Sequence, residues 1–184
     1  MISRDSALEM VEKEIENDNL RKHMLAVSKI MGALADKKSE EDKEKWILVG
    51  LLHDLDYEQT KDNPEMHGLI AAEMLKDVLP EECLQAIKAH NTMTGIEPDS
   101  ELAKALIAAD ALSGLIVPTA LMMPTRKLSE VTAKSLKKKF SDKSFARTVS
   151  RANIMVCEEL GIERREFFTL ALDALQPISD DLDL

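Results

Sequence analysis

Residues 39–57 read SEEDKEKWILVGLLHDLDY, and this stretch gives the clearest indication of the fold class. Ser39 is followed by three acidic residues, which is the pattern of a capped helix start with negative charge in the first turn. The apolar residues from Trp46 to Leu52 then follow at helical spacing, up to His53 and Asp54. The stretch therefore predicts a buried helix that brings an imidazole and a carboxylate into the protein interior.

The rest of the chain continues this helical pattern. Aromatic residues make up only 3%, and no alternation of apolar and polar residues argues for a sheet. Caps, prolines and glycines divide the chain into helices expected at about 3–16, 20–34, 39–54, 63–79, 80–90, 100–110, 128–140, 144–160 and 164–175. Gly114 and Pro118 are expected to disturb the apolar stretch after the sixth helix. The sequence predicts an all-α, single-domain helical bundle of about eight to nine helices.

Length and composition agree with one domain spanning residues 1–184. The chain has a mass of 20.5 kDa, with 45% hydrophobic and 32% charged residues, which is a globular composition. It shows neither an apolar run of membrane-spanning length nor a signal-peptide pattern, so we expect a cytoplasmic protein. Cys83 and Cys157 match no zinc spacing and form no disulfide framework. They predict two buried free thiols in a reducing compartment.

The charge is unevenly distributed. The net charge of −10 argues against a nucleic-acid polymer as partner. Between Arg126 and Arg151, however, nine basic residues stand against two acidic ones, so this segment carries +7 and the remainder −17. A cationic segment on an anionic protein suits a small anionic molecule. A solvated helix surface is the alternative for most of these side chains.

Six side chains are placed unusually, because each shares a helix face with apolar residues. They are His23, His53, His67 and His90, which are all the histidines of the chain, together with Asp54 and Asp110. A carboxylate on an apolar face is costly unless it is paired, hydrogen-bonded or bound to a metal. A helical bundle without metal, in which the histidines form ordinary core hydrogen bonds, remains open. A shared metal site, built from facing helices, explains all six together and is the interpretation we prefer.

The order of these residues resembles the HD superfamily of metal-dependent phosphohydrolases, which is named for its adjacent histidine and aspartate. Four sequence segments carry the resemblance. They are Leu51–Tyr57, His67–Gly68 together with the following Ile70–Ala72, Ala89–Asn91, and Ala108–Leu112. It covers residues 20–114, and the helices at about 128–175 are expected to pack onto this part. The chain is most similar to small stand-alone members whose substrates the resemblance does not identify.

The resemblance implies a set of metal ligands. In one-metal members the ion is held by the residues that match His23, His53, Asp54 and Asp110. In two-metal members the residue matching Asp54 bridges the ions, while those matching His67 and His90 bind the second. Because both extra histidines are present, we expect two divalent ions. Imidazole and carboxylate ligands suit iron, manganese, zinc or nickel.

The resemblance also implies a reaction. We expect hydrolysis of phosphate esters or anhydrides of a nucleotide-like small molecule through a metal-activated water, with Asp54 and Asp56 as catalytic residues. The basic segment supplies the candidates for substrate binding, which are Lys139, Lys143, Arg147 and Arg151. The expected partner is therefore a small phosphorylated anion, with neither a membrane nor a nucleic-acid polymer. The protein is expected to be a monomer or homodimer.

Two other functional classes share this scaffold. Mixed-valent di-iron oxygenases of the HD type carry a lysine shortly after the HD aspartate, whereas the first lysine here is Lys61, seven positions on. A non-catalytic, metal-stabilised binding module is the second alternative, although degenerate members usually lose ligands. The Gly-Tyr-Pro motif of cyclic-di-guanylate phosphodiesterases is missing. Tyr57 and Glu58 stand where guanosine-tetraphosphate hydrolases carry Glu-Asp.

Overall fold

The computed structural model describes residues 1–184 and is all-helical, as predicted. Its nine α-helices are α1 (Arg4–Glu14), α2 (Asp18–Lys38), α3 (Lys43–Leu52), α4 (Leu69–Leu75), α5 (Glu81–His90), α6 (Glu101–Leu121), α7 (Ala133–Ser141), α8 (Arg151–Met155) and α9 (Arg164–Leu175). Single 3-10 turns lie at Glu40–Asp42, Pro64–Met66, Thr92–Thr94, Leu128–Glu130, Val156–Glu158 and Gln176–Ile178. There is no strand.

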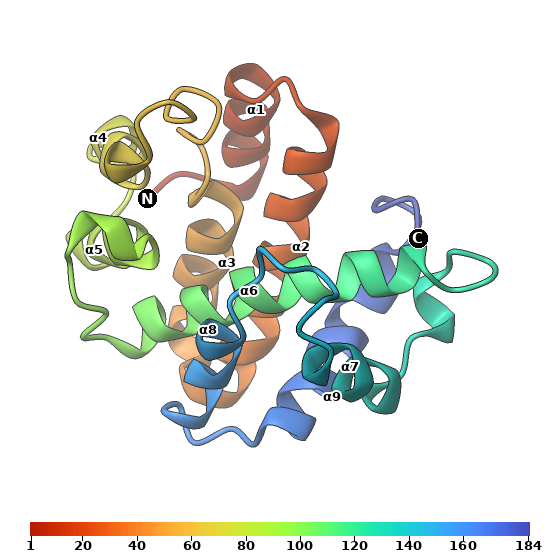
Figure 1. Ribbon diagram of the computed structural model, residues 1–184. Helices are drawn as coiled ribbons and strands as arrows, with labels where there is room; N and C mark the ends of the chain where they lie inside the picture. Colours follow the sequence, from red (N-terminus) through yellow and green to blue (C-terminus); the bar gives the residue numbers. More distant parts are fainter.

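Helices α2 and α3 form the tightest pair of the core (Figure 1). Gly50 makes this possible, because a Cβ atom there would lie 2.8 Å from the Cα of Ser28. The Ser28 hydroxyl donates to the carbonyl of Ile47 at 3.0 Å and joins the two backbones. This close approach sets His23 on α2 beside His53, the residue that ends α3.

Helix α6 crosses the middle of the molecule (Figure 1). The prediction that Gly114 and Pro118 disturb the stretch after residue 110 is wrong. The helix begins at the predicted Ser100 cap but runs on through Gly114 and Pro118 to Leu121. Fourteen of its 21 residues are buried, so tertiary packing outweighs the local cost of these two residues. By length and composition α6 could cross a membrane, contrary to the expectation that no such run exists. Its apolar window is 72% buried, as in a core helix.

The helix predicted at about 144–160 is not formed over its whole length. Residues 142–150 form a loop that passes in front of α6 (Figure 1), and only the short α8 follows. The Asp142 carboxylate accepts from the backbone N–H of Ser144 at 2.9 Å, and Ala146 has a positive φ of 43°. Both features stop helix formation before Ser150, whose side chain caps α8. The predicted helix at 128–140 also begins later, at Ala133, because Thr132 forms the cap.

The remaining helices follow the prediction more closely. Helix α5 and helix α9 have the predicted limits, and α9 packs against both α2 and α7. The helix expected at 63–79 is shorter, because Gly68 interrupts it with a φ of 86°. Cys83 and Cys157 are buried free thiols, as predicted, and burial raises the pKa of each to about 11.

Candidate metal centre

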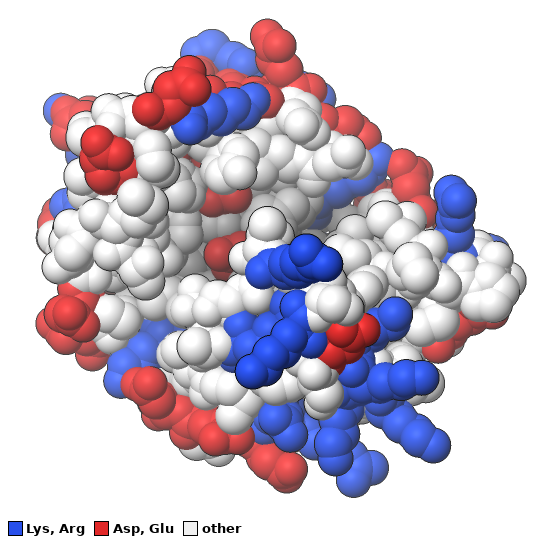
Figure 2. Space-filling model, in the orientation of Figure 1, with Lys and Arg blue, Asp and Glu red and all other residues white.

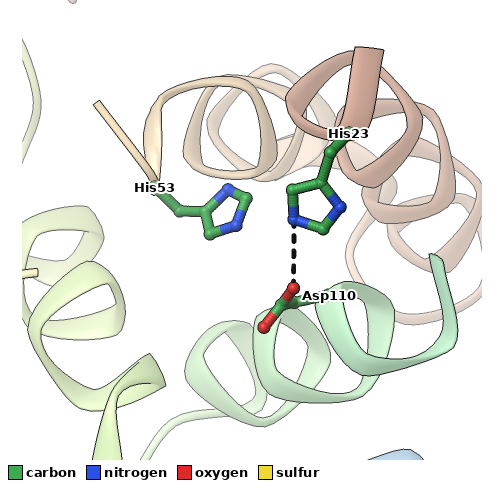
Figure 3. A group of neighbouring side chains, drawn as sticks. All are labelled: His23, His53 and Asp110. Atoms are coloured by element: carbon green, nitrogen blue, oxygen red, sulfur yellow. Dashed lines mark ion pairs between the residues drawn. The ribbon is translucent and has the colours of Figure 1, made fainter. Parts of the chain in front are cut away.

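The six predicted ligand residues meet at one place. They come from α2, from the end of α3 and the turn after it, from the segment before α4, and from α5 and α6. Five of them line a cavity of about 530 Å³: His23, Asp54, His67, His90 and Asp110. His53 is fully buried beside them. Figure 3 shows the His23, His53 and Asp110 side chains pointing toward one another from α2, α3 and α6.

Asp54 stands at the centre of this group. Its Oδ1 atom lies 3.2 Å from His53 Nε2, 3.3 Å from His67 Nε2 and 3.5 Å from His90 Nε2. Its Oδ2 atom lies 3.6 Å from His23 Nε2, which is also 3.1 Å from Asp110 Oδ1. All four imidazoles therefore turn the same ring nitrogen, Nε2, toward the two carboxylates.

The other ring nitrogen of each histidine is held from behind. His53 Nδ1 donates to the Gly50 carbonyl at 3.0 Å, and His90 Nδ1 donates to the Ile87 carbonyl. His67 Nδ1 lies 2.8 Å from Asp56 Oδ1, and His23 Nδ1 lies 3.0 Å from Ser113 Oγ. A carbonyl or carboxylate can only accept, so His53, His67 and His90 carry a proton on Nδ1. This is how proteins orient metal-binding imidazoles, since Nε2 keeps its lone pair.

The resulting donor set fits a cation. In neutral His67 and His90 both Nε2 atoms are acceptors, yet they lie only 3.0 Å apart. His53 Nε2 is a buried polar atom without any hydrogen-bond partner. Buried acceptors crowded in this way are unfavourable unless a positive charge lies between them. A divalent metal ion supplies that charge, and imidazole nitrogen with carboxylate oxygen is a common ligand set for transition metals.

The close approach of these side chains also shifts the pKa values of Asp54, His53 and His67. Burial opposes ionisation of Asp54, but the surrounding imidazoles hold its pKa well below the usual range. Burial lowers the pKa of His53 to about 4, which keeps this ring neutral and able to bind a metal. For His67, burial is outweighed by Asp54 and Asp56, which raise its pKa to about 9. In the metal-free protein a proton on His67 thus takes the place of a metal ion.

Two overlapping sets of side chains bring their ligand atoms close enough to hold a metal ion. Within each set, all ligand atoms lie within 4.8 Å of one another; the sets are His23, His53 and Asp110, and His53, Asp54 and His90. The two sets share His53, and Asp54 belongs to the second. Its Oδ2 atom faces His23, while Oδ1 faces His67 and His90. Asp54 is therefore within reach of both groups of histidines, and its bridging role stays a prediction.

Metal binding is expected to strengthen with pH. His67 must release its proton before Nε2 can bind a metal, and its pKa is about 9 in the metal-free protein. Apparent affinity for the ion at His67 and His90 should rise by up to about tenfold per pH unit from pH 7 to 9, then level off. Calorimetric titration at pH 7, in two buffers of different ionisation enthalpy, should show about one proton released. Equal heats in both buffers would contradict this assignment.

Asp56 faces away from the cavity. It is fully buried, and besides His67 it accepts from the backbone N–H groups of Gly68 at 2.8 Å and Ala71 at 2.9 Å. All hydrogen bonds of its carboxylate go to the start of α4 and to the back of the His67 ring. The prediction that Asp56 is a catalytic residue allowed it to orient the attacking water, to contact the surroundings of the second metal, or to be a surface residue. The structure places it behind His67, a predicted ligand of the second metal, where it can position that ring.

None of the four predicted substrate-binding cations lines the cavity. The Arg151 guanidinium donates to backbone carbonyls of the loop, including Ala146 at 2.6 Å and Phe145 at 2.5 Å. It therefore has a structural role rather than the predicted substrate contact. The Lys139 ammonium lies 4.2 Å from the centre of the Phe145 ring, and Arg147 Nε donates to the Ser144 carbonyl. The Lys143 side chain is exposed.

Sequence reasoning missed several residues of the site. Tyr57 packs its ring edge-on against His67, with the ring centres 5.4 Å apart, and lines the cavity. The neutral side chains of Asn17, Asn19 and Asn153 line it too. Ser113 is the partner of His23 and lies three residues after Asp110, on the same face of α6. Only this last spacing was visible in the sequence.

Comparison with known proteins gives the family. A family model described as HD domain matches residues 20–115, which is just over half of the chain. No curated protein and no solved structure matches the chain significantly. Proteins with this domain bind divalent metal ions and are generally metal-dependent hydrolases. The matched residues contain the entire His and Asp cluster described above, and the chain belongs to the HD-domain family.

Proposed function

We propose that this protein is a metal-dependent hydrolase of phosphate esters, acting on a small nucleotide-like molecule. The observation that carries the proposal is the arrangement of the buried acceptor atoms: His67 Nε2 and His90 Nε2 lie 3.0 Å apart, and His53 Nε2 has no partner. This arrangement favours a bound cation, whose place a proton on His67 takes in the metal-free protein. The family match makes phosphate hydrolysis the reaction that such a site best supports.

We infer that the ligands form two groups that share the Asp54 carboxylate. His23, His53 and Asp110 are assigned to one ion, because their ligand atoms lie within 4.8 Å of one another. His67 and His90 are assigned to the other and Asp54 to both, because Asp54 faces His23 with one oxygen and His67 and His90 with the other. Divalent ions held by these residues would lower the pKa of a bound water molecule and would neutralise charge on phosphoryl oxygens. The protein holds the imidazoles in place through the groups behind them, so little reorganisation is required during reaction.

The cavity lining restricts the substrate. It contains no Lys and no Arg, and its polar side chains beyond the cluster are amides and hydroxyls. Phosphate charge is therefore left to the metal ions, while neutral groups face the rest of the molecule. Such a site favours a phosphomonoester with an uncharged polar body, such as a nucleoside or sugar, over a polyphosphate.

Asn153 is the first of these groups to test. It is half-buried on α8, lines the cavity, and its side-chain amide has no partner within the protein. Replacing Asn153 by Ala should raise KM by about two- to tenfold with little change in kcat, because one hydrogen bond to bound substrate is lost. Steady-state kinetics on the best phosphomonoester measures both constants. Asn63→Ala, on an exposed loop outside the cavity, is the matched control. An unchanged KM for Asn153→Ala would remove this residue from the substrate site.

Metal analysis combined with a substrate panel tests the proposed function. Protein purified without a histidine tag or chelator should contain close to two transition-metal ions per chain. It should hydrolyse at least one phosphomonoester in a panel of phosphomonoesters, phosphodiesters and nucleotides. About one ion would indicate the one-metal form, with His67 and His90 on the substrate side. Absence of metal, with no turnover after metal addition, would refute the proposal.

The oxygenase alternative has less support in the geometry. Lys61, the first lysine after the HD pair, lies 4.0 Å from Glu58 and does not line the cavity. Glu58 in turn accepts from the backbone N–H groups of Glu16 and Asn17, so it holds the turn between α1 and α2. Oxygen consumption by the iron-loaded protein with a polyol or phosphonate would revive this alternative.

A further inference from the structure

A second charged cavity lies between α7 and the first turn of α9. It has a volume of about 410 Å³ and shares no residue with the metal centre. Four basic side chains and one acidic one line it: Lys134 and Lys137 from α7, and Glu163, Arg164 and Arg165 at the start of α9. Figure 2 shows Lys and Arg side chains gathered over this part of the surface. We call it the α7–α9 cavity.

The positive charge of this cavity is not neutralised within the protein. None of its four cations has a carboxylate within 4.0 Å, although Lys22, Lys38 and Lys45 elsewhere form ion pairs. Glu163 offsets one charge, so the lining carries about three net positive charges. Like charges gathered at one place destabilise the fold unless an anion joins them. The cluster is therefore a candidate ligand site on a chain whose net charge is −10.

One donor of the cavity, Arg164, is also held in place. The Arg164 guanidinium lies 4.9 Å from the centre of the Phe140 ring, and its Nη1 atom lies 3.9 Å from the sulfur of Met155. Arg164 is thus fixed between α7 and α8 while its charge stays unpaired. Lys134 and Lys137 are three residues apart on α7, so both reach the same side of that helix.

We infer that the α7–α9 cavity binds a small polyphosphate anion, either free or as part of a nucleotide. About three unpaired positive charges match a ligand of similar negative charge, and Lys and Arg are the usual donors to phosphate oxygens. The cavity is of small-molecule size, and the overall negative charge of the chain disfavours a long polyanion. This binding is independent of the proposed hydrolysis, because the metal cavity contains no Lys or Arg.

Calorimetry with inorganic tripolyphosphate on the full, chelator-treated protein tests the inference, since bound metal would otherwise compete for the probe. One equivalent should bind per chain. Lys134→Ala combined with Lys137→Ala should weaken binding by at least about tenfold, and Arg165→Glu should do the same. Lys138→Ala is the matched control, because it removes an exposed charge of α7 that does not line the cavity. It should change the affinity by less than about twofold.

A nucleoside triphosphate in the same assay separates the two sources of the ligand. Equal affinity supports recognition of the phosphate chain alone, and tighter binding supports a nucleotide. No binding of either probe at millimolar concentration would overturn the inference. An equal loss in Lys138→Ala would also overturn it, because the attraction would then be diffuse. Since the metal is removed, a negative result leaves the proposed hydrolysis untouched.

Discussion

Asp54→Ala is expected to abolish binding of both metal ions and to reduce phosphomonoester hydrolysis by at least about 10³-fold. Asp54 is the one carboxylate in contact range of all four imidazoles, with oxygen–nitrogen distances from 3.2 to 3.6 Å. Its removal leaves each proposed ion one ligand short and takes away the negative charge that offsets both ions. Elemental analysis and kinetics on the same preparation measure the two effects.

Two further variants separate charge from folding. Asp54→Asn keeps the volume of the side chain but removes its charge, so it should also lose metal while retaining a folded circular dichroism spectrum. Asp62→Ala, an exposed carboxylate of the same connecting segment without an ion pair, should leave metal content and rate unchanged. Two ions per chain in folded Asp54→Asn would refute the bridging assignment.

Asp56→Asn is expected to act on both stability and the second ion. Two buried oxygens of Asp56 accept from three donors: His67 Nδ1, the Gly68 N–H and the Ala71 N–H. An amide offers one acceptor and places its own N–H₂ against a donor. The free energy of unfolding should therefore fall by about 2–4 kcal/mol. His67 loses its orienting partner, so affinity for the second ion should fall by about 10- to 100-fold.

The two roles of Asp56 are distinguished by metal stoichiometry. A positioning residue should leave the ion at His23, His53 and Asp110 in place, so the purified variant should hold about one ion per chain. Urea unfolding of metal-free protein measures the loss of stability separately, with Asp62→Asn as control. If the variant kept full stability and two tightly bound ions but lost hydrolysis, the positioning role would be wrong and Asp56 would take part directly in the reaction.

Helix positions were largely predictable because local signals governed them. Ser100 caps α6, and the apolar spacing of α9 reproduces Arg164–Leu175. Prediction failed where a distant group competed with the local pattern. Burial carries α6 through Pro118, whereas the bonds from Arg151 and the positive φ of Ala146 hold 142–150 as a loop. Such effects depend on neighbours that sequence spacing does not reveal.

Residue order and spacing were enough to predict the all-α class, the resemblance to the HD superfamily and the six side chains that meet at the candidate metal centre. A buried imidazole or carboxylate needs a hydrogen-bond partner or a metal ion, so six of them on apolar helix faces can be recognised from residue order and spacing. Which atoms face one another follows only from the packing of the helices. This packing turned every Nε2 inward through partners such as the Gly50 and Ile87 carbonyls, moved Asp56 behind His67, and left the basic residues outside the metal cavity. These outcomes depend on the distances between helices. Close packing of the core sets those distances, and the local sequence pattern does not reveal them.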